Sequence, residues 1–186
     1  MYITGEDKSA VSKDLRTAIF GIVIKEGDKS DYIALKKEWQ EDTSVDGRVI
    51  VLRALGRTQH LELLNDYLRF MFNDVAIQDL HTGAMALAAN AKTRKAFWGY
   101  IQESFDSIKD KLGKNMLVLD RFLLSSLRKF NDRETEAEIA KFFEGKDNRG
   151  YDRSLNVISD TILGRAAYKE RDATVILEWL TEHGYA

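Results

Sequence analysis

The chain has 186 residues, of which 44% are hydrophobic and 31% charged, and its formal net charge is −2. This balance is typical of a globular domain with a substantial core. Lysine and arginine never form a block, which argues against nucleic acid and membrane surfaces as partners. The absence of cysteine excludes disulfides and argues against a structural zinc site. With no apolar run near the roughly 20 residues of a membrane span and no signal-peptide pattern, we expect a cytoplasmic protein.

Proline is also absent, although an average domain of this size contains roughly nine. Apolar residues recur at steps of three and four almost from end to end, which predicts an all-α fold of about ten helices with no sheet. The β-branched cluster Ile19–Ile24 could instead form a buried strand, but the serine before it and the glycine after it favour a helix. The helices are expected to begin near Ser12, Ser30, Ser44 or Asp46, Thr58, Gln78, Thr93, Lys114, Asn131 or Asp132, Arg149 and Asp172.

Every second helix start recurs at a spacing of roughly 33–36 residues, which is the size of a two-helix repeat unit. We therefore expect an irregular HEAT/armadillo-like stack of antiparallel helical hairpins that forms a curved wall. Residues 1–11 are expected to be a flexible N-terminal segment. Residues 12–186 are expected to be a single helical-repeat domain that forms part of a larger one.

The sequence offers few candidates for catalysis. None of the three histidines, His60, His81 and His183, has another histidine three or four residues away, which is the spacing that places two metal ligands on one helix face. His81 could form a dyad with Asp79. A surface or partly buried polar role is the better interpretation of His81, because no activated nucleophile lies nearby in the sequence. An all-α enzyme that uses this pair is therefore a weak hypothesis.

Other residues stand out by their surroundings. Trp39, Trp98 and Trp179 all fall at helical spacing with apolar residues and are expected in the core.

Arg121 lies within the otherwise strongly apolar segment Leu117–Leu124. The favoured interpretation of Arg121 is an ion pair within or between helices. The alternative is a cation that faces an internal cavity and can receive a carboxylate.

Six segments stand out together, in the order Ala54-Leu55-Gly56, Ala76–Asp79, Lys95–Trp98, Asp120-Arg121-Phe122, Lys141–Phe143, and Arg171–Ala173 leading to Trp179-Leu180. Taken in this order, they resemble the C-terminal helical domain of the M1-family zinc aminopeptidases. The similarity extends from about Ser12 to Tyr185 and is greatest to the cytosolic puromycin-sensitive type and its fungal counterparts. The order and spacing of the segments make the resemblance specific, since each one alone is common.

The resemblance implies a parent metallo-exopeptidase that removes N-terminal residues from peptides, with its zinc held by an HExxH helix and a later glutamate. This sequence contains no HExxH. Its segment Gly83–Leu87 lacks the glutamate of the family's GAMEN-type loop and is better interpreted as a small-residue packing face. The resemblance therefore implies no catalytic residue, metal ligand or cofactor in this chain, and it assigns the zinc to a catalytic domain outside it.

The resemblance also implies a role for the domain. In the family the helical domain closes a substrate chamber over the parent's own catalytic domain and contacts the distal end of the peptide substrate. Arg121 matches an arginine of the puromycin-sensitive type and is the candidate substrate-binding residue. The endoplasmic-reticulum members carry a functional arginine in the segment aligned with Leu87–Asn90, where this sequence has none. The alternative function is a stand-alone helical-repeat scaffold for protein interaction.

Overall fold

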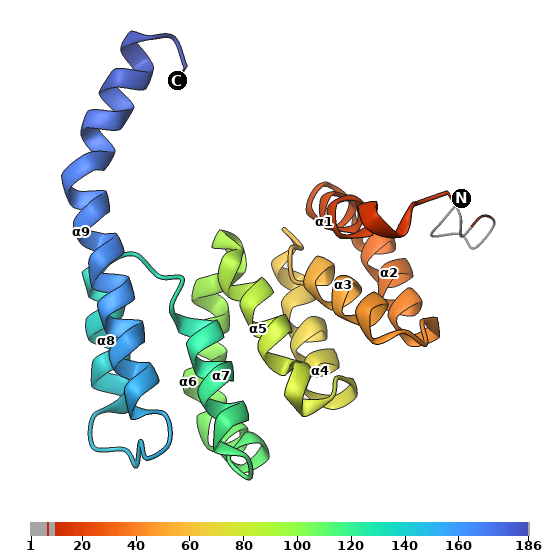
Figure 1. The fold of residues 1–186 in the computed structure, drawn as a ribbon, viewed down its shortest axis with the longest axis horizontal. Coiled ribbons are helices and arrows are strands. Elements are labelled where there is room, and N and C mark those ends of the chain that lie inside the picture. Colours follow the sequence, from red (N-terminus) through yellow and green to blue (C-terminus); the bar gives the residue numbers. More distant parts are fainter. Residues whose placement is uncertain (1–6, 8–9, 186) are drawn as a thin grey trace.

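The computed structural model describes residue 7 and residues 10–185, and these residues form nine α-helices, three short 3-10 turns and no strand (Figure 1). The prediction of an all-α fold is confirmed. Most of the predicted N-terminal segment 1–11 lies outside the described residues. None of the helices in the described part is both long and apolar enough to cross a membrane. The helices are α1 (Arg16–Glu26), α2 (Lys29–Glu41), α3 (Val45–Leu55), α4 (Leu64–Asp74), α5 (Leu80–Ala89), α6 (Ala91–Leu112), α7 (Met116–Leu127), α8 (Arg133–Phe143) and α9 (Asp152–Glu182).

The odd-numbered helices form a row in which each contacts the next, from α1 through α3, α5 and α7 to α9. The even-numbered helices pack on members of this row. Figure 1 shows the helices following one another from the N-terminal end on the right to α9 on the left. The assignment of this arrangement to the HEAT/armadillo class stays a prediction.

A continuous core of buried apolar side chains extends from α1 to α9. Its centre is aromatic: the ring of Phe122 in α7 lies 5.8 Å from that of Phe72 and 6.2 Å from that of Phe97. Small residues in α5 allow neighbouring helices to approach closely. A Cβ atom at Gly83 would lie 2.6 Å from the sulfur of Met71, so a larger residue would clash there. This contact supports the interpretation of Gly83–Leu87 as a packing face.

Two of the expected helix caps are present as predicted. The side chain of Ser44 accepts a hydrogen bond from the Gly47 N–H at 3.0 Å, and that of Asp132 accepts one from the Thr135 N–H at 2.8 Å. Each bond satisfies a backbone donor that has no partner inside its helix. The segment Ile19–Ile24 lies in α1, so the alternative of a strand is wrong.

Several helix starts differ from the prediction. Ser12 makes no side-chain cap bond and precedes a 3-10 turn over Lys13–Leu15, so α1 begins only at Arg16. Asp28, not Ser30, caps α2, because its carboxylate accepts from the Ser30 and Asp31 N–H groups while the Asp31 side chain accepts from the Asp28 N–H. Asn90, not Thr93, caps α6 by accepting from the Lys92 N–H. The helix expected from Thr58 begins only with α4, after a 3-10 turn over Leu61–Leu63.

The largest difference lies at the C-terminal end, where the predicted ninth and tenth helices are one helix, α9. Asp172 does not cap a new helix; its carboxylate pairs with the neighbouring Arg171 at 2.7 Å. No proline interrupts the segment, and its only glycine, Gly164, is accommodated within the helix. The second half of α9 extends beyond the other helices (Figure 1), and Trp179, expected in the core, is 51% exposed.

A partly buried ion pair connects α2 to α4. The carboxylate of Asp66 accepts a hydrogen bond from the Lys36 ammonium at 2.7 Å and another from the Tyr32 hydroxyl at 3.0 Å. Burial alone would raise the pKa of Asp66, but these two hydrogen bonds and the charge of Lys36 outweigh it and hold that pKa below its ordinary value. The ionised carboxylate therefore stabilises the folded chain.

We expect Asp66→Asn to lower the free energy of unfolding at pH 7 by about 1 kcal/mol or less, since the pair is partly exposed to solvent. A carboxylate whose pKa is lowered by folding stabilises the chain above its unfolded pKa, and this contribution is lost as the pH falls through the folded pKa. The difference between the two proteins should be constant from neutral pH to about 5 and should shrink below about pH 4. Urea unfolding across this pH series measures it, and a difference that grows in acid would contradict the assignment.

Candidate functional site

Arg121, the predicted substrate-binding residue, is exposed on α7. Among the residues that the structure describes, its guanidinium has no ion pair or hydrogen bond. The ion pair that the sequence favoured is therefore not found in this part of the chain. Within the described part of the chain, Arg121 is therefore an unpaired cation exposed on α7.

A cavity of about 580 Å³ lies where the C-terminal ends of α1, α3 and α5 meet the start of α6 and the segment after α7. Five of its lining residues are lysine or arginine and none is acidic. We call this cavity the basic pocket. Its lining residues are Lys25, Arg53, Arg57, Gln59, Met85, Ala86, Ala89, Asn90, Ala91, Lys92 and Lys129.

Most of the cations in the basic pocket have no ion-pair partner among the residues that the structure describes. Lys25 pairs with the adjacent Glu26 at 2.8 Å. No ion pair to the remaining four cations, Arg53, Arg57, Lys92 and Lys129, occurs within the described ranges. Like charges gathered around one cavity repel one another, and an anion bound between them would relieve that repulsion.

Two local features shape the basic pocket. Asn90 connects its walls: its side-chain amide donates to the Thr58 carbonyl at 2.7 Å and to the Gly56 carbonyl at 3.3 Å, while its oxygen caps α6. The N-terminus of α6 therefore opens into the pocket, where its backbone dipole favours negative charge. Gly21 in α1 leaves room for Arg57, since a Cβ atom there would lie 2.4 Å from the guanidinium.

Sequence reasoning missed this site because its cations are scattered along the chain. Lys25 and Arg53 each lie in the last turn of their helix, where cations complement the helix dipole. Because α1 and α3 are neighbours in one row, their ends meet. Arg121 does not line the pocket. The end of the segment Leu87–Asn90 does line the pocket. The resemblance implies that other members of the family carry an arginine in this segment. In this chain the cations of the pocket come from other lining residues.

His81 and Asp79, the catalytic candidates of the sequence, do not form a dyad among the described residues. The ring of His81 bonds to the Gln78 carbonyl at 2.8 Å, and no hydrogen bond between His81 and Asp79 is found there, which removes the proposed dyad. In the same part of the chain, no group of three or more histidine, aspartate or glutamate residues is arranged to hold a metal ion. The residues present therefore do not fit the family's zinc, and we assign no reaction step to them.

Comparison with known proteins identifies the domain. Residues 1–164 match the family model described as the ERAP1-like C-terminal domain. Aminopeptidase 2 of Candida albicans is 29% identical over 99% of this chain, and the alanine/arginine aminopeptidase of Saccharomyces cerevisiae is 28% identical over 96% of it. Aminopeptidase M1-C of rice is 26% identical over 91%. The chain spans about one fifth of the length of these relatives, 20%, 21% and 20% respectively. It belongs to the ERAP1-like C-terminal domain family and matches a C-terminal domain of the M1 aminopeptidases.

Proposed function

We propose that this chain is the non-catalytic helical domain of a cytoplasmic zinc aminopeptidase, with residues 12–186 forming one folded unit. In this proposal the domain closes the substrate chamber over the enzyme's own catalytic domain, which carries the zinc. The family match and the aminopeptidase relatives support the enzyme class. The absence of HExxH from the sequence supports a role in substrate binding instead of catalysis.

Within that role, the basic pocket binds the C-terminal carboxylate of the peptide, at the end distal to the cleaved bond. The observation that carries this assignment is a set of four cations around one cavity that have no ion pair within the described residues, with no carboxylate among the residues that line the cavity. Arginine can hold a carboxylate through two parallel hydrogen bonds, and Arg53 and Arg57 are the arginines of the set. Arg121, exposed on the same row of helices, remains the candidate for a further contact with the peptide chain.

The proposal is tested by titrating the 186-residue chain with two peptides of one sequence, one with a free C-terminal carboxylate and one amidated. The N-termini of both peptides are acetylated, so that the two peptides differ only at the C-terminus and neither carries a free amino group there. We expect amide NMR shifts at Arg53, Arg57 and Lys92 with the free carboxylate. We also expect roughly tenfold weaker binding of the amidated peptide, since charge-assisted hydrogen bonds contribute about 1.5–3 kcal/mol.

Binding of the carboxylate peptide should weaken with added salt, because the pocket cations are partly exposed to solvent. Equal affinity for both peptides would contradict the carboxylate assignment and would favour a scaffold that recognises side chains. Release of free amino acids from either peptide by the purified chain, supplied with zinc, would contradict the non-catalytic role.

A further inference from the structure

The basic pocket holds more positive charge than one peptide carboxylate would neutralise. Four of its cations have no ion pair among the described residues, and none of its lining residues is acidic. A single bound carboxylate would bring one negative charge to these four positive charges. A second anionic group on the same ligand would relieve the repulsion that remains.

The unpaired cations come from both sides of the C-terminal end of α5. In the row of odd-numbered helices, α5 lies between α3 and α7 (Figure 1). Arg53 lies in the last turn of α3 and Arg57 follows that helix, whereas Lys129 follows α7. Lys92 lies in the first turn of α6. Because packed helices lie about 8–10 Å apart, the two sides of the pocket are separated by roughly two such spacings, which their long side chains reduce. Two anionic groups on one ligand can therefore contact both sides at once.

The surface between the two sides is apolar. Met85, Ala86 and Ala89 of α5 line the pocket there. Methylene groups of a ligand can pack on these side chains, whereas a polar group placed there would lose water without gaining a hydrogen bond from them. The pocket volume of about 580 Å³ is in the range of small-ligand sites and exceeds what one carboxylate needs. The pocket therefore suits two carboxylates that are joined by a short apolar segment.

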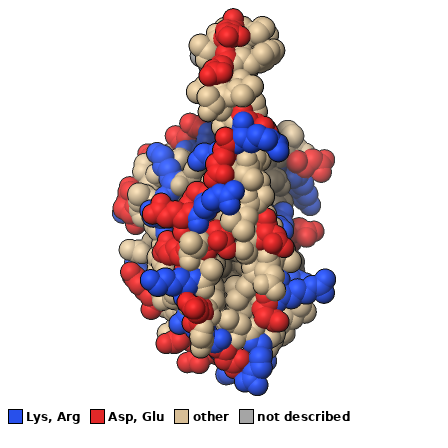
Figure 2. Space-filling view, turned by 90° about the vertical axis from the view of Figure 1, so that its left-hand side faces the viewer, with Lys and Arg blue, Asp and Glu red and all other residues tan. Residues whose placement is uncertain are grey.

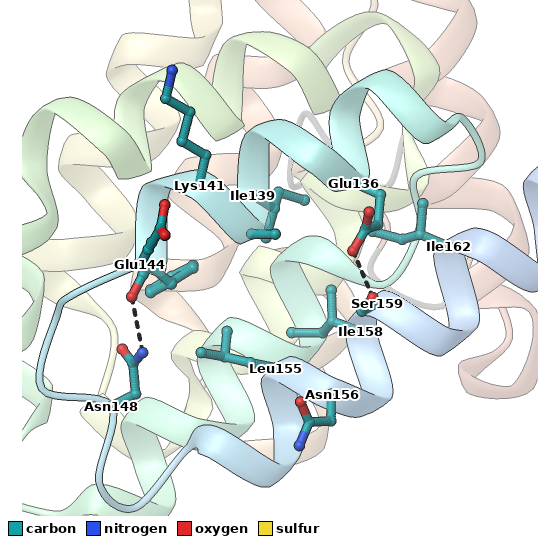
Figure 3. A pocket seen from close by; sticks show the side chains of 12 residues that line it. Glu136, Ile139, Lys141, Glu144, Asn148, Leu155, Asn156, Ile158, Ser159 and Ile162 are labelled. Carbon is teal, nitrogen blue, oxygen red and sulfur yellow. Dashed lines mark hydrogen bonds between the residues drawn. The ribbon is translucent and has the colours of Figure 1, made fainter.

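The end of the molecule formed by α8 and α9 differs in charge. Figure 2 shows acidic and basic side chains interspersed on this end. A hollow of about 660 Å³ lies between the two helices, where the carboxylates of Glu136 and Glu144 accompany a single cation, Lys141 (Figure 3). The excess of cations therefore distinguishes the basic pocket from this larger hollow, which offers no comparable attraction for an anion.

We propose that the basic pocket selects peptides whose C-terminal residue is acidic, glutamate or aspartate. This selectivity rests on the proposed function, which places the C-terminus of the peptide in the pocket. The main-chain carboxylate binds Arg53 and Arg57, whose planar guanidinium groups can hold it through paired hydrogen bonds. The side-chain carboxylate binds Lys92 and Lys129, whose ammonium groups are point charges on flexible stems. The methylene groups between the two carboxylates pack on the end of α5.

The selectivity is tested by titrating the 186-residue chain with acetylated peptides that have free C-termini. Two of them differ only in the last residue, which is glutamate in one and glutamine in the other. We expect the glutamate peptide to bind roughly tenfold more tightly, because a carboxylate forms stronger hydrogen bonds with the lysines than a neutral amide does. Equal affinity for the two peptides, or tighter binding of the glutamine peptide, would overturn the proposal.

A third peptide separates local contact from overall charge. Its terminal glutamate is exchanged with an internal glutamine, so its composition and net charge equal those of the glutamate peptide. It should bind like the glutamine peptide, since attraction at long range depends on net charge and contact in the pocket depends on position. If it binds as tightly as the glutamate peptide, the pocket does not select the terminal residue.

Failure of this proposal is distinguishable from failure of the proposed function. The proposed function predicts that the glutamine peptide binds more tightly than its amidated form. If that preference is found but the glutamate and glutamine peptides bind equally, the pocket holds the main-chain carboxylate and the selectivity for an acidic residue is wrong. If neither preference is found, both proposals are wrong.

The assignment of the side-chain carboxylate to two lysines is tested by Lys92→Gln together with Lys129→Gln, which should abolish the preference for the glutamate peptide. The matched control is Lys114→Gln together with Lys141→Gln, because both lysines are exposed and neither lines the basic pocket. Each Lys→Gln substitution changes the charge by −1, so both double variants move the formal net charge from −2 to −4. The control should keep the preference. A pocket variant that also keeps it, or a control that loses it as fully, would overturn the assignment.

Discussion

Replacing Phe122 by alanine is expected to lower the free energy of unfolding by about 3–5 kcal/mol, the cost typical of deleting a buried aromatic ring. Phe122 is fully buried, and its ring packs edge-on against Phe72 of α4 and Phe97 of α6. The cavity left by the ring would lie where three helices meet, so neighbouring side chains could fill it only in part. A domain of this size is stable by about 5–15 kcal/mol, so this loss would remove a large share of its stability.

Urea unfolding followed by circular dichroism measures the effect, and the same helix supplies a control. Leu117→Ala, at an exposed position of α7, should change the free energy of unfolding by about 0.5 kcal/mol or less. Phe122→Leu should cost less than Phe122→Ala because it leaves a smaller cavity. A Phe122→Ala variant no less stable than the Leu117→Ala variant would show that these three helices do not share a core at this point.

Much of this fold can be predicted from the sequence because helical periodicity reports burial directly. Phe97, Ile101, Phe105, Ile108 and Leu112 recur at steps of three and four, and all five are buried on one face of α6.

Helix ends are harder to predict, because several polar residues compete for the same backbone donors. Asp28 caps α2 in place of Ser30, whose hydroxyl itself donates to Asp28 at 2.6 Å. Asp172 has the right chemistry for a cap, but a residue can cap a helix only where the preceding backbone leaves helical geometry. In α9 the backbone continues through Asp172 as helix.

The candidate site was less predictable, because it depends on contacts between helices distant in sequence. Arg121 is conspicuous in the sequence since its neighbours are apolar, yet it lies outside the basic pocket. Arg53 and Lys129 are inconspicuous in the sequence, yet the packing of successive helices brings them to one cavity. The sequence signal that could have found the site is a cation in the last turn of each of two successive odd-numbered helices, α1 and α3. This signal can be used only when it is known that those helices are neighbours.

Reversing two charges in the basic pocket, Arg53→Glu together with Arg57→Glu, is expected to weaken binding of the free-carboxylate peptide at least tenfold. The double variant removes both guanidinium groups of the pocket and adds two carboxylates that repel the ligand. Binding of the amidated peptide should change far less, so the preference for the free carboxylate should disappear. Isothermal titration calorimetry or NMR titration with both peptides measures the change.

The matched control is Arg69→Glu together with Arg153→Glu, because both arginines are exposed and neither lines the basic pocket. Each Arg→Glu substitution changes the charge by −2, so both double variants move the formal net charge from −2 to −6. Long-range attraction for an anion depends on net charge and should fall similarly in both, whereas contact with the carboxylate is lost only in the pocket variant. If the control weakens binding as much as the pocket variant does, the peptide is attracted by overall charge and the basic pocket is not its site.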